Sequence, residues 1–561
     1  MDIVAAELVL GPMTRYADST TVTVWVETSM ACEVELRTAA LHRRERTFEV
    51  EGHHYALVVV DYLAPGSDVP YGIALDGRPV WPRDGDRPPS RLRTRDPEAP
   101  LTVVFGSCRV DRPHTEPWTL DPEADPRGVG VDALRALSVA CSSGERPLPD
   151  VILMLGDQVY ADEGLAPQVR ARQLARRGNS EPRDGVADFE EYTWLYEDSW
   201  SDADVAWLLS TVPSAMVFDD HDVRDDWNIS REWRHEMQQL PWWHARITGA
   251  YMSYWLYQHL GNVSPTVLRE EGLLPRLQAP GAGDRVLRNF AERADDEVDG
   301  RKLSTWSYVR DLGVVRLVVV DTRSGRVLEN HRRGMLSDDE WRGVDAGLRG
   351  DCEHLLVASS LPLLLERSLH DLESWNEAVC EGAWGRRAAR YGEWLRQALD
   401  LEHWAAFRSS FDRLVRRLGD IGAGRRGRAP ATVLVLSGDV HHSYVAPLRY
   451  PTSAAVRSAV VQLVSSPLRN AFPRSLQRGF RLSNTRGARL LGRLLTRSVG
   501  IRPPDVDWTL TAGPMYGNTL TSVRLHGPAA EVRIELAVRG AQRPVLREVY
   551  RGDLHRDVVT S

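Results

Sequence analysis

The chain has 561 residues, of which 42% are hydrophobic and 26% are charged, and its formal net charge is -8 at pH 7. This length is too great for one hydrophobic core, so we expect two or more domains. The acidic balance argues against general nucleic-acid affinity, and five scattered cysteines do not form a disulfide framework. No secretory signal or membrane-spanning apolar stretch is visible, which favours a cytoplasmic location by default, with secretion as the alternative.

Residues 1–97 are expected to form a small all-β sandwich domain of immunoglobulin or fibronectin type. Short strand-like runs occur at 20–28, 32–38, 54–63 and 71–77, separated by Gly, Pro and Asp. Nothing in this part of the chain indicates catalysis. Residues 82–100 are rich in proline and charge, which is typical of a linker to the next domain.

Residues 98–561 are expected to form the second domain, in which buried strands alternate with helices. Apolar runs at 101–105, 151–155, 214–218, 314–320, 354–365 and 432–436 have the length and composition of buried strands, and 518–526 and 530–549 are further strand candidates. Helical spacing occurs near 130–140 and 186–210, and Ser337 before two aspartates predicts a helix N-cap. One amphipathic helix is predicted from the spacing of Trp404, Phe407, Phe411, Leu414 and Leu418.

Residues that suit metal binding follow several of these strands directly. The pattern occurs as GSC at 106–108, GDQVY at 156–160, DDHD at 219–222 and GDVHH at 438–442. The carboxyl ends of strands in open α/β sheets meet at one crevice. Carboxylates suit hard cations and phenolates suit Fe(III), so the repetition predicts a dinuclear metal site. Taken alone, GDQVY has a simpler interpretation, in which Asp157 caps a helix and Tyr160 packs in the core.

The order and spacing of these motifs, together with FDDHDVRDDWN at 218–228 and VVVDTR at 318–323, resemble the PhoD-like alkaline phosphatases. These are calcineurin-type metallophosphoesterases with an N-terminal β domain, and the resemblance extends over nearly the whole chain. It implies an α+β fold, in which a four-layer α/β/β/α sandwich follows the small all-β sandwich. It also implies a site that holds Fe(III) together with Ca(II), with other divalent metals as alternatives.

The resemblance assigns roles to individual residues. It implies iron ligation by Cys108, Asp157, Tyr160 and His441. Asp157 would bridge to a second metal shared with Asp220 and Asp439, and Asp219, Asp225 and Asp226 are further oxygen donors nearby. His221 would be the general acid on the leaving group, with the alternative that it is only ion-paired to its acidic neighbours. Arg109 and Arg224 are candidates for binding the phosphate, since guanidinium matches it bidentately; His442 is a weaker candidate, and solvated arginines are the alternative.

Three departures from the broader metallophosphoesterase pattern concern the second metal. Asp220 precedes His221 where that pattern has an Asn-His pair, Ser359 and Ser360 stand where it has a histidine, and GDVH replaces GHxH. Because each change brings oxygen-rich surroundings in place of nitrogen or amide donors, it favours calcium over zinc at the second position.

The expected activity is therefore metal-dependent hydrolysis of phosphate esters by a metal-bound hydroxide. One alternative is a phosphodiesterase specialised for lipid, polymer or nucleotide diesters, and another is a non-catalytic binding scaffold. The arginine tract at 469–502 contains no acidic residue and favours the first alternative. It would collect anionic substrate or make weak contact with an anionic surface, unless it only balances the acidic body.

Overall fold

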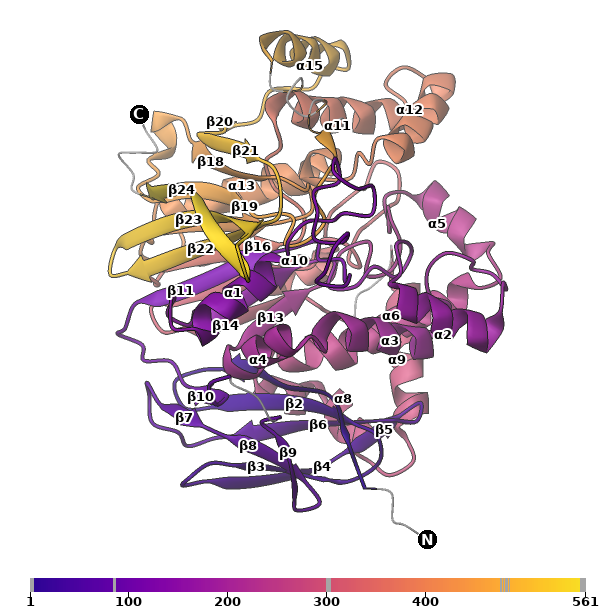
Figure 1. Ribbon diagram of the computed structural model, residues 1–561. Coiled ribbons are helices and arrows are strands. Elements are labelled where there is room, and N and C mark those ends of the chain that lie inside the picture. The colour runs from indigo at the N-terminus through magenta and orange to yellow at the C-terminus, as the bar shows by residue number, and fades with distance from the viewer. Residues whose placement is uncertain are drawn as a thin grey trace.

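The N-terminal part of the chain forms two antiparallel sheets of four strands each (Figure 1). The computed structural model describes residues 5–83, 87–298, 304–474, 477, 479, 483 and 485–554. The first sheet has the order β1 (Leu8–Ala17), β2 (Val22–Thr28), β6 (His53–Val60), β5 (Phe48–Val50). The second has the order β4 (His42–Arg46), β3 (Glu33–Arg37), β8 (Gly72–Leu75), β9 (Arg78–Trp81). Alternate valines of β2 belong to an apolar core shared by both sheets, so the predicted strand pattern is confirmed here.

The predicted linker is only partly a linker. Within it, β10 (Arg91–Arg93) pairs with β7 (Asp68–Pro70), and the side chain of Leu92 is fully buried. The composition of this segment is that of an exposed connection. It nevertheless packs against the domain, because one apolar side chain is buried and the backbone groups at the edge of β7 need hydrogen-bond partners.

Two larger sheets follow. The first contains six strands in the order β13 (Ser214–Val217), β12 (Val151–Leu155), β11 (Leu101–Gly106), β22 (Thr519–His526), β23 (Ala529–Arg539), β24 (Pro544–Asp553). The second contains eight, in the order β14 (Tyr308–Leu312), β15 (Val315–Val320), β16 (His354–Ser359), β17 (Thr432–Ser437), β19 (Ala459–Val464), β18 (Ser443–Arg449), β20 (Asp507–Trp508), and β21 (Ala512–Met515) also pairs with β18. A strand lies within each predicted run of this part of the chain, but β16 ends at Ser359 and not at 365, and the run 530–549 divides into β23 and β24.

The two larger sheets pack face to face between helices. Leu317 and Val319 of β15 share an apolar core with Phe105 of β11, whereas Val318 and Val320 lie in a second core with residues of a helix. That helix is α13 (Arg408–Gly422), and α10 (Asp338–Gly347) lies beside it; α1 (Ala133–Ser142) covers the six-stranded sheet on the other side. The layers are helix, sheet, sheet and helix, so the predicted fold class is confirmed (Figure 1).

The remaining helices lie between the two parts and at the edge away from the N-terminal sheets. They are α2 (Pro167–Arg177), α3 (Phe189–Trp200), α4 (Ala203–Thr211), α5 (Arg231–Gln238), α6 (Trp243–Ser253), α7 (Pro265–Glu271), α8 (Leu273–Leu277), α9 (Gly283–Asp296), α11 (Arg367–Cys380), α12 (Arg386–Ala398) and α15 (Arg486–Ser498). Short turns are η1 (Tyr254–Gln258), η2 (His259–Gly261), η3 (Trp404–Ala406) and η4 (Thr452–Ala454). None of the helices that the structure describes is long and apolar enough to cross a membrane.

One helix prediction needs correction and one is confirmed. The amphipathic helix begins only at Arg408, because Trp404 belongs to η3 and Phe407 has φ -128° and ψ 58°, outside the helical region. Both aromatic side chains are nevertheless buried, so a turn and a helix produce the apolar spacing of one helix. Ser337 caps α10 as predicted, and its side chain accepts a hydrogen bond from the amide of Glu340.

The N-terminal sheets are attached to the helical layer by a buried arginine. Arg15 is fully buried and donates hydrogen bonds to the carbonyl oxygens of Tyr257 and Gln258 at 2.7 and 2.5 Å. The ring of Trp25 lies 5.4 Å from that of Tyr257. This interface fixes η1, and through Gln258 it reaches a residue beside the site described next.

Candidate functional site

The candidate site lies where β11, β12, β13 and β17 end. Cys108, Asp157, Asp439 and His441 all adopt positive φ, between 51° and 67°. Such backbone is uncommon for residues other than glycine and costs on the order of 1–3 kcal/mol each, so it persists only where the surroundings enforce it. Gly156 has φ +103°, and a Cβ there would lie 2.6 Å from the Cβ of Asp219. The turns therefore bring these strand ends closer than larger residues would allow.

A buried aspartate holds two of these strand ends together. The Oδ2 atom of Asp222 accepts hydrogen bonds from the amides of Asp157 and Asp219, at 3.0 and 2.9 Å. Its Oδ1 accepts from the amide of Val159 and from Nε2 of Gln258, both at 3.3 Å. Asp222 thus positions the ends of β12 and β13, a role that its place in the acidic run at 218–228 did not reveal.

Three of the predicted iron ligands, Asp157, Tyr160 and His441, are linked by direct contacts or through Asn470. The hydroxyl of Tyr160 is 3.5 Å from Oδ2 of Asp157, and it accepts a hydrogen bond from Nδ2 of Asn470 at 3.1 Å. The Nδ1 atom of His441 is 2.9 Å from the carbonyl oxygen of Asn470. A carbonyl only accepts, so Nδ1 must donate, and Nε2 retains the lone pair that a metal needs. Asn470 therefore orients two candidate ligands, and no motif in the sequence indicated it.

The fourth predicted iron ligand, Cys108, is fully buried. Its sulfur lies 3.1 Å from Oγ of Ser107 and 3.3 Å from Oγ of Ser466. Burial raises the pKa of the Cys108 thiol well above its usual value, and the negative charges of Asp157 and Asp439 raise it further. A cation at this end of the site would lower the pKa of Cys108 again, because it stabilises the thiolate.

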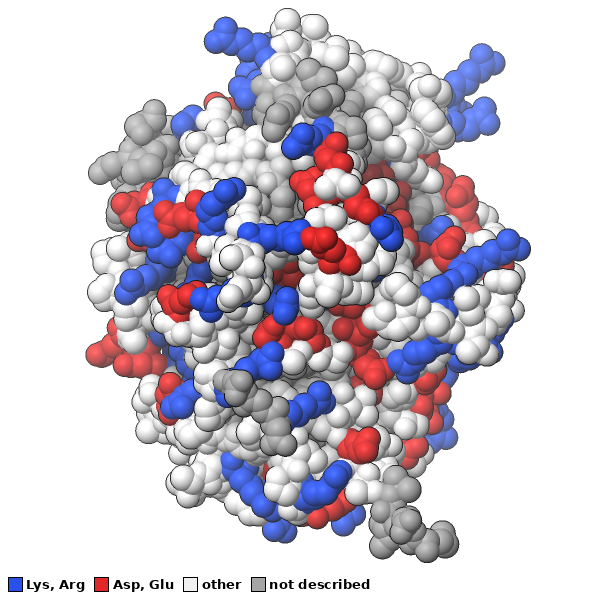
Figure 2. Space-filling view, viewed as in Figure 1, with Lys and Arg blue, Asp and Glu red and all other residues white. Residues whose placement is uncertain are grey.

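Acidic side chains form the other end of the site. Carboxylate oxygens of Asp219, Asp220 and Asp439 lie within 4.8 Å of one another, and so do the candidate ligand atoms of Asp157, Asp220 and His221. Asp220 belongs to both groups. Figure 2 shows acidic side chains gathered across the middle of this face of the molecule.

Several buried carboxylate oxygens in or beside these groups have no hydrogen-bond partner among the residues that the structure describes. They include Oδ1 of Asp157, Oδ2 of Asp219 and Oδ1 of Asp226. Burial, with the charges of Asp219 and Asp220, raises the pKa of Asp157 well above its usual value, against the opposing effect of His221. Buried carboxylates without partners are costly, and coordination of a cation would satisfy them. The donor set therefore fits a metal centre.

Arg323 lies among the acidic side chains and is fully buried. Its guanidinium pairs with Asp219, with Asp220 at 3.1 Å and with Asp439 at 3.4 Å, and its Nη1 pairs with Glu402. The VVVDTR motif contains this arginine, but only the fold shows that it holds acids from three other segments. It offsets part of the negative charge and fixes the positions of the carboxylates.

A histidine outside every motif contacts the last of these acids. His403 lies between Asp439 and Glu373, with Nε2 at 3.0 Å from Oδ2 of Asp439 and Nδ1 at 2.7 Å from Glu373. Burial alone would lower the pKa of His403, but these two acids outweigh it and raise the pKa well above its usual value. Asp439 thus already has two partners, Arg323 and His403, before any metal is considered.

His221 is held at the edge of the site. Its Nδ1 lies 3.0 Å from Oδ1 of Asp162, and its ring stacks on that of Tyr160 with 4.6 Å between centroids. Burial alone would lower its pKa, but Asp162 and then Asp220 and Asp157 raise the pKa well above the usual value. The Nε2 atom is left facing the acidic groups, 3.8 Å from the exposed Asp225. A protonated imidazole at the rim is the state that a general acid requires.

Two of the predicted substrate contacts are not supported. Arg109 is buried and pairs with Asp132 at 2.8 Å, and it also donates to the carbonyl oxygen of Ser199 at 2.7 Å, so its guanidinium serves the fold. His442 is fully buried, with Nδ1 at 2.7 Å from the carbonyl oxygen of Val440 and Nε2 at 3.1 Å from Glu366. Neither side chain faces solvent from which a phosphate ester would enter.

Arg224 remains a candidate for substrate contact. It is half-buried and lies 5.6 Å from the ring centroid of Trp242. With Asp162 and Asp225 it lines a hollow of about 910 Å³ next to His221. Its position at the rim, beside the residues that hold the candidate acid, suits a cation that meets an incoming anion.

The comparisons with known proteins agree with this arrangement. Residues 140–291 match the model of the PhoD-like phosphatase family, and residues 5–92 match a domain of unknown function, DUF7800. The first match contains Asp157, Tyr160 and the acidic run around His221. A search of curated protein sequences finds no match.

One solved structure, titled "Structure of PhoD", aligns with 99% of this chain and 90% of its own, with a TM-score of 0.57 and 14% identity. A type III pullulan hydrolase from Thermococcus kodakarensis reaches a TM-score of only 0.16 at 10% identity. The first likeness shows the fold, and the family match gives the activity class. The chain therefore has the fold of that solved structure, and its residues 140–291 match the PhoD-like phosphatase family, a class of phosphoric ester hydrolases.

Proposed function

We propose that the protein hydrolyses phosphate esters with two metals, iron at the Cys108 end and calcium at the acidic end. Cys108, Asp157, Tyr160 and His441 offer thiolate, carboxylate, phenolate and imidazole, a set that suits iron. Asp219, Asp220 and Asp439 offer only oxygen, which suits calcium. Asp220 lies near Asp157 as well as near Asp219 and Asp439, which supports a bridge between the two sets. The broader assignment, metal-dependent phosphatase, holds with other divalent metals as well.

The observation that supports this proposal most strongly is the set of buried carboxylate oxygens without partners. Oδ1 of Asp157 and Oδ2 of Asp219 have neither a donor nor water access in the part of the chain that the structure describes. A fold that needed these acids only for packing would pair them or replace them with neutral residues. Two cations would satisfy them.

When bound, the metals would supply Lewis acidity and a water of lowered pKa. The protein's own residues orient and complete the site. Asn470 and Asp222 fix the ligands, Arg323 and His403 hold the acids, and Arg224 meets the substrate at the rim. His221 holds a proton on Nε2 for the leaving oxygen, while Asp162 keeps the imidazole in place.

The proposal is tested by metal analysis of the purified protein, combined with a panel of phosphate monoesters and diesters. We expect iron and calcium to co-purify with active protein, and Asp157→Asn to lose both metal and activity while Asp150→Asn, at the surface before β12, keeps both. Full activity after exhaustive removal of metals, shown by elemental analysis, would contradict the proposal.

A further inference from the structure

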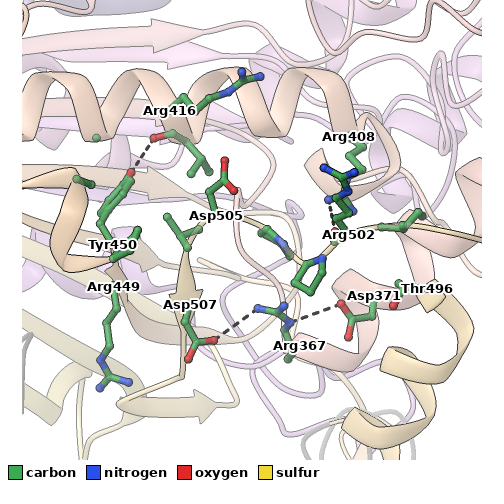
Figure 3. Close-up of a pocket in the computed structure, with 18 of the residues that line it drawn as sticks. Arg367, Asp371, Arg408, Arg416, Arg449, Tyr450, Thr496, Arg502, Asp505 and Asp507 are labelled. Atoms are coloured by element: carbon green, nitrogen blue, oxygen red, sulfur yellow. Dashed lines mark hydrogen bonds and ion pairs between the residues drawn. The ribbon is translucent and has the colours of Figure 1, made fainter.

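A second large hollow lies away from the candidate catalytic residues, between α11, α13, α15 and the segment that leads to β20 (Figure 3). Its volume is about 960 Å³, within the usual range of small-molecule sites. Eight arginines and four aspartates line it, which is a formal excess of four positive charges. The arginines are Arg367, Arg408, Arg416, Arg425, Arg449, Arg493, Arg497 and Arg502.

The aspartates of this hollow face only some of the arginines. Asp371 and Asp507 lie on either side of Arg367, at 3.5 and 3.6 Å, and Figure 3 shows this arrangement. Asp420 pairs with Arg425 at 2.7 Å. Three of the four aspartates therefore gather at two places, and Asp505 is the one other acid among the eight arginines of the lining.

Several arginines of the lining have no acidic partner among the described residues. Within the described ranges, no carboxylate lies at ion-pair distance from Arg493, Arg497 or Arg502. Arg408 is held next to them, because its Nη2 donates to the carbonyl oxygen of Arg502 at 2.5 Å. Bringing like charges together around one hollow costs free energy that an anionic ligand would recover.

Part of the lining is also preformed, although Arg493, Arg497 and Arg502 are themselves exposed. Arg367 stacks on Trp508, with its guanidinium carbon 4.4 Å from the ring centroid. Its Nε and Nη1 atoms are buried and form the ion pairs with Asp371 and Asp507, but neither atom has a hydrogen-bond partner among the residues that the structure describes. Tyr450 forms part of the wall and is fixed by a 2.8 Å hydrogen bond to the carbonyl oxygen of Val415. Donors held in place in this way lose little entropy when a ligand binds.

This hollow does not belong to the catalytic centre. Arg367 and Asp371 are four residues apart and share one face of α11, while Glu373 points to His403 on the catalytic side. On α15, Gly492 packs against Asp371, and Arg493, Thr496 and Arg497 line the hollow. Leu490, Leu491 and Leu494 of α15 are more than half exposed. Figure 1 places α15 at the edge of the molecule farthest from the N-terminal sheets.

We propose that this hollow binds an anion with several phosphate groups, at a site separate from the one that hydrolyses esters. The inference rests on the charge and the shape of the hollow and does not depend on the metals of the catalytic centre. The phosphate groups have two sources, a soluble oligophosphate or the headgroups of an acidic phospholipid, next to which the exposed leucines of α15 would lie.

The experiment titrates the full-length protein with sodium tripolyphosphate by calorimetry. We expect Arg493→Gln, Arg497→Gln and Arg502→Gln, combined in one variant, to weaken binding by at least about tenfold, because charge-assisted contacts to phosphate are lost. The matched control combines Arg386→Gln, Arg387→Gln and Arg390→Gln on α12, which removes the same charge from an exposed surface outside the hollow. It should bind as the unchanged protein does. Asp157→Asn, which disables the catalytic centre, should also retain binding.

A second arm uses sedimentation with vesicles of phosphatidylglycerol or of phosphatidylcholine alone. Recruitment to phosphatidylglycerol that needs the three arginines and is reduced by Leu490→Ser, Leu491→Ser and Leu494→Ser would support the same site with a lipid headgroup as ligand. The proposal is overturned if neither probe depends on the three arginines. It is also overturned if tripolyphosphate binding is lost in Asp157→Asn and kept in the arginine variant, because the probe would then occupy only the catalytic centre.

Discussion

Replacement of His221 by asparagine tests the assignment of the general acid. Asparagine keeps a polar side chain beside Asp162 and removes the proton that Nε2 would give to the leaving oxygen. General acid catalysis contributes on the order of 10²–10⁴-fold, equivalent to about 3–5 kcal/mol of barrier. The side chain of His221 is 16% exposed, so it reaches the rim from its buried anchor on Asp162. We therefore expect a loss of this size in kcat for an alkyl phosphate, whose leaving group needs a proton.

The assay compares substrates that differ only in their leaving group. For 4-nitrophenyl phosphate the loss should be small, because nitrophenolate leaves without a proton. Metal content should be unchanged in His221→Asn. His235→Asn, at an exposed position on α5, controls for the exchange of residue type.

Two results would refute this reasoning. An equal loss with good and poor leaving groups would mean that His221 donates no proton in the rate-limiting step. Loss of a metal ion from the variant would make His221 a ligand, which its distance to Asp157 and Asp220 permits. Either outcome would move the acid role to another residue.

Three further variants test other parts of the structure. Tyr160→Phe should abolish a visible charge-transfer band of the iron-loaded protein and weaken iron retention, as measured by absorption and elemental analysis. An unchanged spectrum would mean that Tyr160 only packs in the core and does not bind iron. Arg323→Met should lower the free energy of unfolding by about 3–5 kcal/mol, because it leaves buried carboxylates without their cation. Added calcium should restore part of the lost thermal midpoint. The control Arg332→Met, at an exposed ion pair, should change the free energy of unfolding by no more than about 0.5 kcal/mol. Burial and a hydrogen bond with Asp198 raise the pKa of Asp111 to about 8. The folded state therefore binds more protons than the unfolded state from about pH 4 to pH 8, and it loses stability as pH rises through that window. Asp111→Asn should raise the melting temperature more at pH 8 than at pH 4, whereas a constant difference would show that this carboxyl does not titrate in that range.

The strands and the fold class were predictable because they depend on local patterns. Apolar runs such as 151–155 and 432–436 have a composition that only a strand buried on both faces requires. The motifs that follow these strands could be recognised because a turn at a strand end needs glycine, and the side chains after the glycine then project into the crevice. The same local reasoning failed at 404–418, where a turn and a helix produced the spacing of one helix.

The support for the site could not be predicted in the same way. Asn470 and His403 stand outside every motif, and Asp162, two residues after Tyr160, had no assigned role. Each of the three is defined by a partner 29 or more residues away in the chain. Arg109 and His442 show the opposite case. Both stand in or beside motifs, but Arg109 is ion-paired with buried Asp132 and His442 with buried Glu366. A side chain's residue type fixes what it is able to bind, and only packing decides which partner it meets.

The sequence by itself thus determined where the strands lie along the chain, since this follows from residue type and local spacing. The candidate metal ligands and the class of chemistry came from the resemblance of the motifs to the PhoD-like alkaline phosphatases. The tertiary structure alone decided which arginines are buried in ion pairs and which are left facing solvent. Arg323 among its acids and Arg493 in the hollow beneath α15 are the same residue type with opposite surroundings. Electrostatic energy depends on the distance between charges in space, and distance along the chain does not determine it.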